Sequence, residues 1–133
     1  MKRLLLGTLF AGVSLLTSGV TVDVVSGYAE TKTVGDYAFL IVKSNSTLRV
    51  SGKPGTIDVL AVGGGGGGAC GFGGGGGGGA VVERINISVT AGDYPVTVGA
   101  GGAKGYESYG FQEAEKGGTS SAFGVSALGG GAG

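Results

Sequence analysis

The stretch from Gly63 to Gly79 constrains this chain more than any other feature, because 14 of its 17 residues are glycine. Two glycine runs, 63–68 and 73–79, enclose a short segment of mixed composition. The flanking segments 57–62 and 80–85 are rich in β-branched residues and poor in turn formers, which is typical of β-strands. The glycine stretch therefore lies between two predicted strands, which is not the setting of an ordinary linker.

Such a stretch is either a flexible coil or a set of ordered, packed rows. Fixing one backbone residue costs about 1–2 kcal/mol, whereas a hydrogen bond contributes only about 1 kcal/mol net, so a single glycine row should stay disordered. Several extended threefold rows can satisfy each other's amides, because glycine alone permits the close approach seen at the axis of collagen. The runs lack Ser, Pro and charge, so we favour packed rows and expect valine at Gly65 or Gly76 to prevent the packing.

The neighbours that such rows require come from this chain or from other subunits, and we expect an oligomer. Further rows are predicted at 99–102 and 129–133. The candidate structural glycines are Gly63, Gly64, Gly65, Gly66, Gly67, Gly68, Gly73, Gly74, Gly75, Gly76, Gly77, Gly78 and Gly79.

The composition excludes several classes of function. Nine basic and nine acidic residues cancel, so the charge gives no indication of a nucleic-acid partner. The lack of histidine removes His-based triads, His metal sites and the commonest general base. The single cysteine, Cys70, excludes an internal disulfide and a CxxC site. We therefore predict no enzyme activity, no cofactor, no metal site and no nucleic-acid binding.

Segment 57–68 imitates the start of a dinucleotide-binding unit, in which a strand runs into glycines. That unit requires a helix after the glycines, whereas here more glycine and then a strand follow. The segment therefore gives no support to a nucleotide site.

The first 30 residues are predicted as a segment of their own, followed by a β-rich, glycine-rich domain over 31–133. Met1-Lys2-Arg3 and the apolar run 4–16 have the charged start and apolar stretch of a secretory signal, with cleavage points after Gly19 or Ala29. The run is too short for a comfortable membrane span. The alternative is an uncleaved anchor, buried against a partner protein.

The body of the chain predicts an all-β fold, in the form of a small antiparallel domain. Segments 20–25 and 81–89 alternate apolar and polar residues, and 37–42 is a continuous apolar run suited to a central strand. We expect 81–89 and 94–98 to form a β-hairpin, with Pro95 at a sheet edge or at a strand start. No segment after residue 16 shows helical periodicity.

Residues 103–118 differ from everything around them, because they hold three aromatic and five charged side chains. The plain interpretation is a solvated loop. The functional interpretation is a receptor-contact loop, in which aromatic rings supply rigid apolar area and charges supply orientation. Nothing positions its acidic residues as a catalytic pair or a metal cage. The candidate contact residues are Tyr106, Glu107, Tyr109, Phe111, Glu113, Glu115 and Lys116.

The order of residues resembles the glycine-rich domain of bacteriophage tail-fibre and adhesin proteins. The resemblance is carried by a strand, a glycine block, a second strand and then two motifs, Tyr-Pro-Val-Thr-Val-Gly-Ala-Gly-Gly at 94–102 and Ser-Ser-Ala-Phe-Gly at 120–124. It covers roughly residues 36–133. In such adhesins polyglycine helices pack into a rigid slab, and the loops between them meet the host receptor.

The resemblance implies a non-catalytic virion structural protein. Because packed glycine rows need neighbours, we expect it to assemble as a trimer or larger. Its implied partners are other virion proteins, copies of itself and a bacterial surface receptor, and its implied location is the virion. The signal-like start is unusual for a fibre protein. The alternative is therefore a secreted or cell-surface glycine-rich bacterial protein whose signal peptide is removed.

Overall fold

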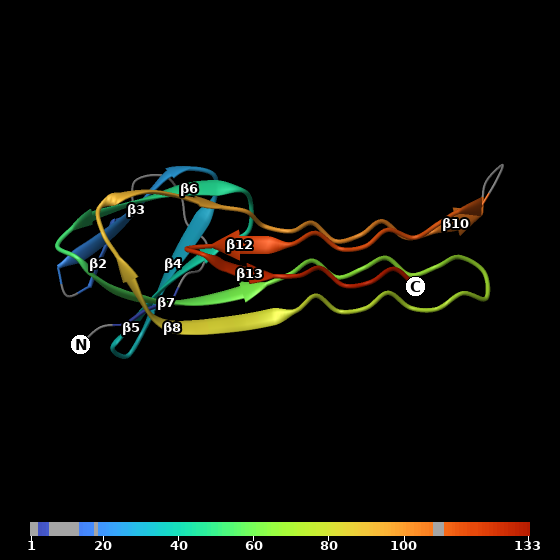
Figure 1. Ribbon diagram of the computed structural model, residues 1–133, viewed down its shortest axis with the longest axis horizontal. Coiled ribbons are helices and arrows are strands. Elements are labelled where there is room, and N and C mark those ends of the chain that lie inside the picture. Colours follow the sequence, from blue (N-terminus) through green and yellow to red (C-terminus); the bar gives the residue numbers. More distant parts are fainter. Residues whose placement is uncertain (1–2, 6–13, 18, 108–110) are drawn as a thin grey trace. The chain divides into compact units, whose positions relative to one another are not determined.

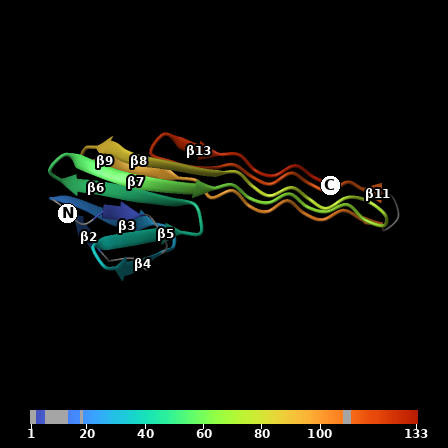
Figure 2. The ribbon, with the colours of Figure 1, turned by 90° about the horizontal axis from the view of Figure 1, so that it is seen from below.

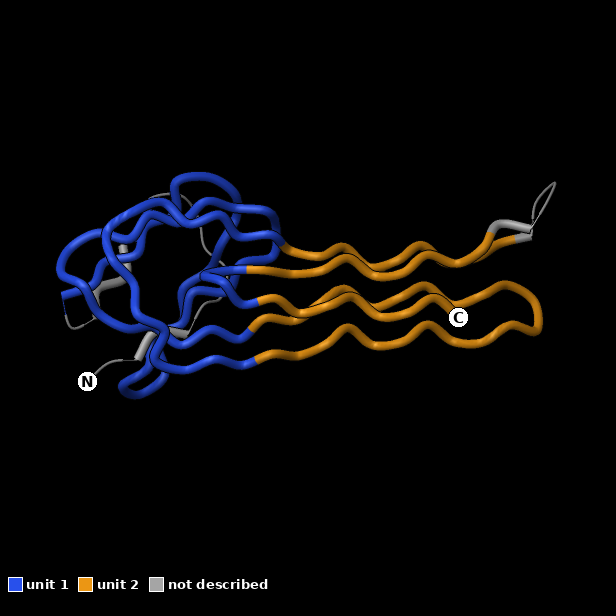
Figure 3. The backbone as a smooth tube through the Cα atoms, in the orientation of Figure 1, with its two compact units in different colours: residues 1–60, 83–97, 122–125 blue, residues 61–82, 98–121, 126–133 orange. Residues whose placement is uncertain are grey.

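The computed structural model describes residues 3–5, 14–17, 19–107 and 111–133, and these ranges contain strands, turns and extended chain (Figure 1). They contain no helix, which confirms the predicted all-β class. The chain divides into two compact units, coloured separately in Figure 3. Unit 1 comprises residues 1–60, 83–97 and 122–125, and unit 2 comprises residues 61–82, 98–121 and 126–133.

An antiparallel four-stranded sheet lies in unit 1, with the strand order β2-β3-β6-β9 (Figure 2). Its strands are β2 (Ser14–Thr17), β3 (Val20–Ser26), β6 (Ser46–Gly52) and β9 (Gly92–Val96). Arg49 on β6 donates two hydrogen bonds to the Asp93 carboxylate on β9, at 2.7 and 2.8 Å. The hydrogen bond from Arg49 lowers the pKa of Asp93 below its ordinary value, and the pair stays exposed to solvent.

A second sheet has five strands in the order β4-β5-β1-β7-β8. They are β1 (Arg3–Leu5), β4 (Ala29–Val34), β5 (Tyr37–Val42), β7 (Gly55–Val62) and β8 (Val81–Val89). β4 and β5 form an antiparallel hairpin, whereas β1 pairs in parallel with both β5 and β7. The predicted antiparallel domain therefore also contains parallel pairing, since β1, a segment from the N-terminal region, lies between β5 and β7.

The core of unit 1 consists of the inward-facing aliphatic side chains of these strands. Strands β3 and β6 alternate buried and part-exposed residues, as the period of two predicts. The largest side chains that are almost completely buried are Leu40, Leu48, Ile57, Val20, Val22, Val50 and Val59.

The expected hairpin of 81–89 with 94–98 is wrong. β8 lies at the edge of the five-stranded sheet, whereas β9 pairs with β6 at the edge of the other sheet. The regular alternation expected in β8 is also interrupted, because Asn86 has a φ of 56° and its amide donates to Oδ1 of Asp58 at 2.8 Å. Pro95 does lie on an edge strand, as predicted, and an edge strand is a position that tolerates proline in a sheet.

A two-stranded sheet of β12 (Ser120–Ala122) and β13 (Val125–Ala127) contains the Ser-Ser-Ala-Phe-Gly motif. The two residues of its turn, Phe123 and Gly124, both have positive φ, at 49° and 77°. Two-residue hairpins of this type match the twist of their strands, although a phenylalanine at positive φ is strained. The Phe123 ring packs on Tyr94, with 4.7 Å between ring centroids, and this contact offsets part of the strain.

Most of the described residues among 1–30 belong to the strands β1, β2, β3 and the start of β4. Val20 and Val22 belong to the buried core, and the predicted boundary after residue 30 falls inside β4. The division into an N-terminal segment and a glycine-rich domain stays a prediction.

Replacing Leu48 by Ala tests the core. Leu48 is completely buried, so we expect the free energy of unfolding to fall by about 2–5 kcal/mol, measured by urea denaturation. The matched control is Leu60→Ala, since Leu60 lies on β7 with 43% of its surface exposed. Equal losses in the two variants would contradict this account of the core.

Candidate functional site

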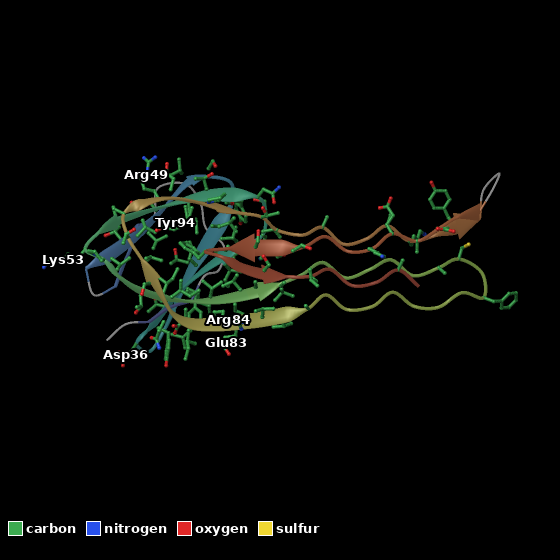
Figure 4. The ribbon with its side chains drawn as sticks, in the orientation of Figure 1. Asp36, Arg49, Lys53, Glu83, Arg84 and Tyr94 are labelled. Carbon is green, nitrogen blue, oxygen red and sulfur yellow. The ribbon has the colours of Figure 1, made fainter. Side chains whose placement is uncertain are left out.

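Five extended segments of unit 2 run side by side and contain most of the glycines (Figures 1 and 3). We call them rows 1 to 5, comprising residues 63–69, 73–80, 99–105, 113–118 and 128–133. Figure 4 shows many side chains on the strands and few along the rows. Rows 1 and 2 contain only glycine apart from one alanine at the end of each.

Row 1 donates backbone hydrogen bonds to two neighbours with a repeat of three residues. The amides of Gly63, Gly66 and Ala69 donate to carbonyl oxygens of row 2, at 2.8–3.0 Å. The amides of Gly64 and Gly67 donate to row 4, at 2.9 and 2.8 Å. The residue numbers of the acceptors fall as those of the donors rise, so row 1 is antiparallel to both rows.

Row 1 also accepts hydrogen bonds from two further neighbours. The carbonyls of Gly64 and Gly67 accept from row 5, at 2.8 and 3.0 Å, and those of Gly65 and Gly68 accept from row 3, at 2.8 and 2.9 Å. Here the residue numbers of donors and acceptors rise together, so rows 3 and 5 run parallel to row 1. Row 1 is therefore a central row with four neighbours.

The outer rows are bonded to one another as well. Row 2 donates to row 5 from Gly77 and Ala80, and row 4 donates to row 5 from Gly117, at 2.8–2.9 Å. Row 4 donates to row 3 from Glu115 and Gly118. Five segments of a single chain thus supply the neighbours that a glycine row requires.

Close packing excludes side chains from much of row 1. A β-carbon at Gly63 or Gly66 would collide with a carbonyl oxygen of row 5, and one at Gly64 or Gly67 with a carbonyl oxygen of row 3. The nearest atom to a β-carbon at Gly65 would be 3.8 Å away, which is an ordinary contact. The threefold repeat therefore turns two of every three residues towards a neighbouring row.

The sequence predicts that valine is excluded at both Gly65 and Gly76, but the structure gives these two positions different surroundings. A β-carbon at Gly76 would collide with the carbonyl oxygen of Gly66, so a side chain there is incompatible with the rows as packed. Gly65 has room for a β-carbon within its own chain. The expectation for Gly65 therefore depends on something outside the chain.

The turn between rows 1 and 2 displays an aromatic side chain. Gly73 donates to the carbonyl of Cys70 at 3.1 Å, and Gly71 has a φ of 61°, a conformation that favours glycine. Phe72 follows in this turn and is fully exposed. Phe72 is not among the contact residues predicted from the sequence, although one aromatic residue between two glycine runs is itself a signal.

The structure divides the predicted contact loop of residues 103–118. Its two ends belong to rows 3 and 4, and β10 (Tyr106–Glu107) pairs with β11 (Phe111–Gln112) between them. Tyr106 is half exposed, and Glu113, Glu115 and Lys116 are exposed. Only the backbone of Glu107 and Phe111 is described, and Tyr109 lies outside the described residues.

Tyr106 and Phe72 belong to the same end of the rows. Gly105, which precedes Tyr106, donates to the carbonyl of Gly68 at 2.9 Å, and Gly68 lies four residues before Phe72. The ends of rows 1 and 3 therefore lie together and lead directly into the two aromatic residues. Within the described ranges, no three metal-ligating side chains cluster, and no helix is long and apolar enough to cross a membrane.

Replacing Gly76 by Ala tests the packing of the rows. We expect a loss of about 1–3 kcal/mol in the free energy of unfolding, because the new methyl group must displace a neighbouring backbone, and thermal unfolding measures it. Gly78→Ala is the control, since a β-carbon there meets nothing within 4 Å. A Gly76→Ala protein as stable as the control would show that the rows are not closely packed.

A family model for a glycine-rich domain matches residues 41–133. Comparison with curated proteins found no match, and comparison with solved structures found none. The matched region begins in β5 and contains all five rows, so it includes both the strands and the hydrogen-bonded glycine network. The chain therefore belongs to the glycine-rich domain family.

Proposed function

We propose that this chain is a non-catalytic structural protein of a bacteriophage virion, in which packed polyglycine-type rows present turns that contact the host surface. The observation that carries the proposal is that exposed aromatic residues lie at one end of a set of hydrogen-bonded rows. The repeat of three residues in the row 1 hydrogen bonds is the repeat of a threefold extended helix.

The rows suit a display role because their backbones hold each other. Each row bonds to at least two others, and the turn residues follow without a linker. A rigid support reduces the conformational entropy that a contact residue loses on binding. Phe72 and Tyr106 then serve as apolar anchors, the type of residue that dominates many protein interfaces.

Support for the virion assignment comes from the resemblance to tail-fibre and adhesin proteins in the motifs at 94–102 and 120–124. The structure gives both motifs a physical role. Gly99 and Gly102 belong to row 3, and Phe123 and Gly124 form the turn between β12 and β13. We propose that the location is the virion and that the assembly contains several copies of the chain.

The alternative proposal is an exported glycine-rich surface protein of a bacterium, favoured by the signal-like run at 4–16. The intact mass of the native chain decides between the two proposals. A chain that retains residues 1–19 and purifies with phage particles supports the virion protein. A chain that begins near Val20 or Glu30 in the culture supernatant supports the exported protein and overturns the virion assignment.

Replacing both Phe72 and Tyr106 by Ala tests the contact role. We expect particles with this variant to adsorb to host cells at least tenfold more slowly, because the variant lacks the exposed apolar area at the row ends. The thermal unfolding of the purified chain should not change. The control is Leu128→Ala, since Leu128 is another exposed apolar residue of unit 2, at the start of row 5. Unchanged adsorption by the double variant would refute the contact role.

A further inference from the structure

Row 1 uses only part of its hydrogen-bonding capacity. A threefold row directs its amides in three directions and its carbonyls in three others. Two sets of amides are bonded to rows 2 and 4, and two sets of carbonyls are bonded to rows 3 and 5. The third set of amides, at Gly65 and Gly68, has no backbone partner among the described residues, and neither has the carbonyl of Gly66.

Two further rows could therefore lie side by side next to row 1. One would accept hydrogen bonds from the amides of row 1, and the other would donate hydrogen bonds to its carbonyls. Row 2 and row 3 both bond to row 1, and no bond joins these two rows to each other in the described part of the chain. The places for these two further rows thus lie on the side of row 1 that rows 4 and 5 do not cover. Gly65, on this side, is exposed.

Glycine occurs on this side where the chain itself does not require it. A β-carbon at Gly65 or Gly68 would have its nearest contacts at 3.8 and 3.6 Å, and neither residue has positive φ. Rows 3, 4 and 5 include alanine, lysine, glutamate or leucine, whereas row 1 keeps glycine from 63 to 68. Glycine at positions with room for a side chain leaves space on this side of row 1 for another backbone to approach closely.

We call the side of row 1 that rows 4 and 5 do not cover, together with the adjoining row 2, the open side of rows 1 and 2. We infer that this open side is an interface with the glycine rows of a second copy of this chain. This inference rests on the proposed function for its setting, a particle that contains several copies, and it names the surface through which copies meet. A second copy offers both unfilled amides and unfilled carbonyls, and its own repeat of three residues matches their spacing. Rows 1 and 2 contain no charged residue, so a charged ligand gains no ion pair there.

The expected area makes this a weak contact in isolation. Two rows of six residues are about 19 Å long at ~3.1 Å per residue and together about 10 Å wide, which gives roughly 200 Å² per copy. A stable complex usually buries about 800 Å² per partner. We therefore expect association only at high protein concentration, and stronger association where a particle holds the copies close together.

Sedimentation velocity of the purified chain, from about 10 μM to 1 mM, tests the interface. The wild-type protein should form dimers or larger species as its concentration rises. Gly65→Ala/Gly68→Ala should associate at least tenfold more weakly with unchanged thermal unfolding, because its methyl groups block a second backbone. Gly131→Ala is the matched control, since a β-carbon there meets nothing within 4 Å and row 5 lies away from the open side.

A wild-type chain that remains monomeric throughout, even if another glycine-rich protein binds it, would overturn the inference, as would a double variant that associates like the wild type. If the double variant unfolds, hydrogen exchange of the wild-type amides decides. Protection of Gly65 and Gly68 that rises with concentration supports the interface, and protection that does not change overturns it. No host cell is used, so failure here is distinct from failure of the contact role of Phe72 and Tyr106.

Discussion

A neighbouring carbonyl oxygen occupies the place of the β-carbon at most positions of row 1, and the structure of unit 2 depends on this exclusion. Gly63 and Gly66 face row 5, and Gly64 and Gly67 face row 3, each without room for a methyl group. The same proximity brings amides within 2.8–3.0 Å of carbonyls in the adjacent rows. The rows can thus form hydrogen bonds between their backbones only because glycine, which has no side chain, lets them approach so closely.

The two units are stabilised by different interactions. Unit 1 buries aliphatic side chains such as Leu40 and Leu48 between its strands, so its stability comes from removing apolar surface from water. Rows 1 and 2 have no side chain larger than a methyl group, and backbone hydrogen bonds between the rows replace apolar burial. Each row requires neighbours on several sides, which explains why five separate segments of the chain contribute.

This difference also bears on the proposed function. Rows 1 and 2 contain only glycine and one alanine each, so they offer little chemistry along their length, and we propose that contacts form where the rows turn or where row 1 is left without a neighbour. Phe72 and Tyr106 represent the first case, and the amides of Gly65 and Gly68 represent the second. The same rigid backbone therefore supports both the proposed host contact and the proposed contact between copies.

The local pattern of apolar and polar residues was sufficient to predict most strands. It failed to predict strand pairing where the paired segments are far apart in the sequence. Segments 20–25 and 37–42 form strands because their alternation or apolar content suits a half-buried or central position. The predicted hairpin failed because pairing of β9 with β6 joins segments about 45 residues apart, as in the pair Leu48–Tyr94, which periodicity does not encode. The left-handed residue Asn86 was missed for a similar reason, since Asp58 holds it from another strand.

The candidate site was also predicted only in part. Composition identified residues 103–118 as unusual and Tyr106 as exposed, but their division into row ends and a short hairpin depends on hydrogen bonds to row 1. Phe72 was missed because an aromatic residue in a turn is buried or exposed according to what packs around that turn. Its exposure follows from the extension of the turn beyond the packed rows.

The sequence by itself determined that the chain is all-β, that its glycine runs lie between strands, and that such runs need neighbouring rows to become ordered. Those conclusions follow from periodicity, from the missing side chains and from the entropy of glycine, all of which are local properties. Only the tertiary structure decided which glycines are indispensable. Gly65 and Gly66 are adjacent and identical, but their places in the three-residue hydrogen-bond repeat leave room for a β-carbon at Gly65 and put a carbonyl oxygen of row 5 against Gly66.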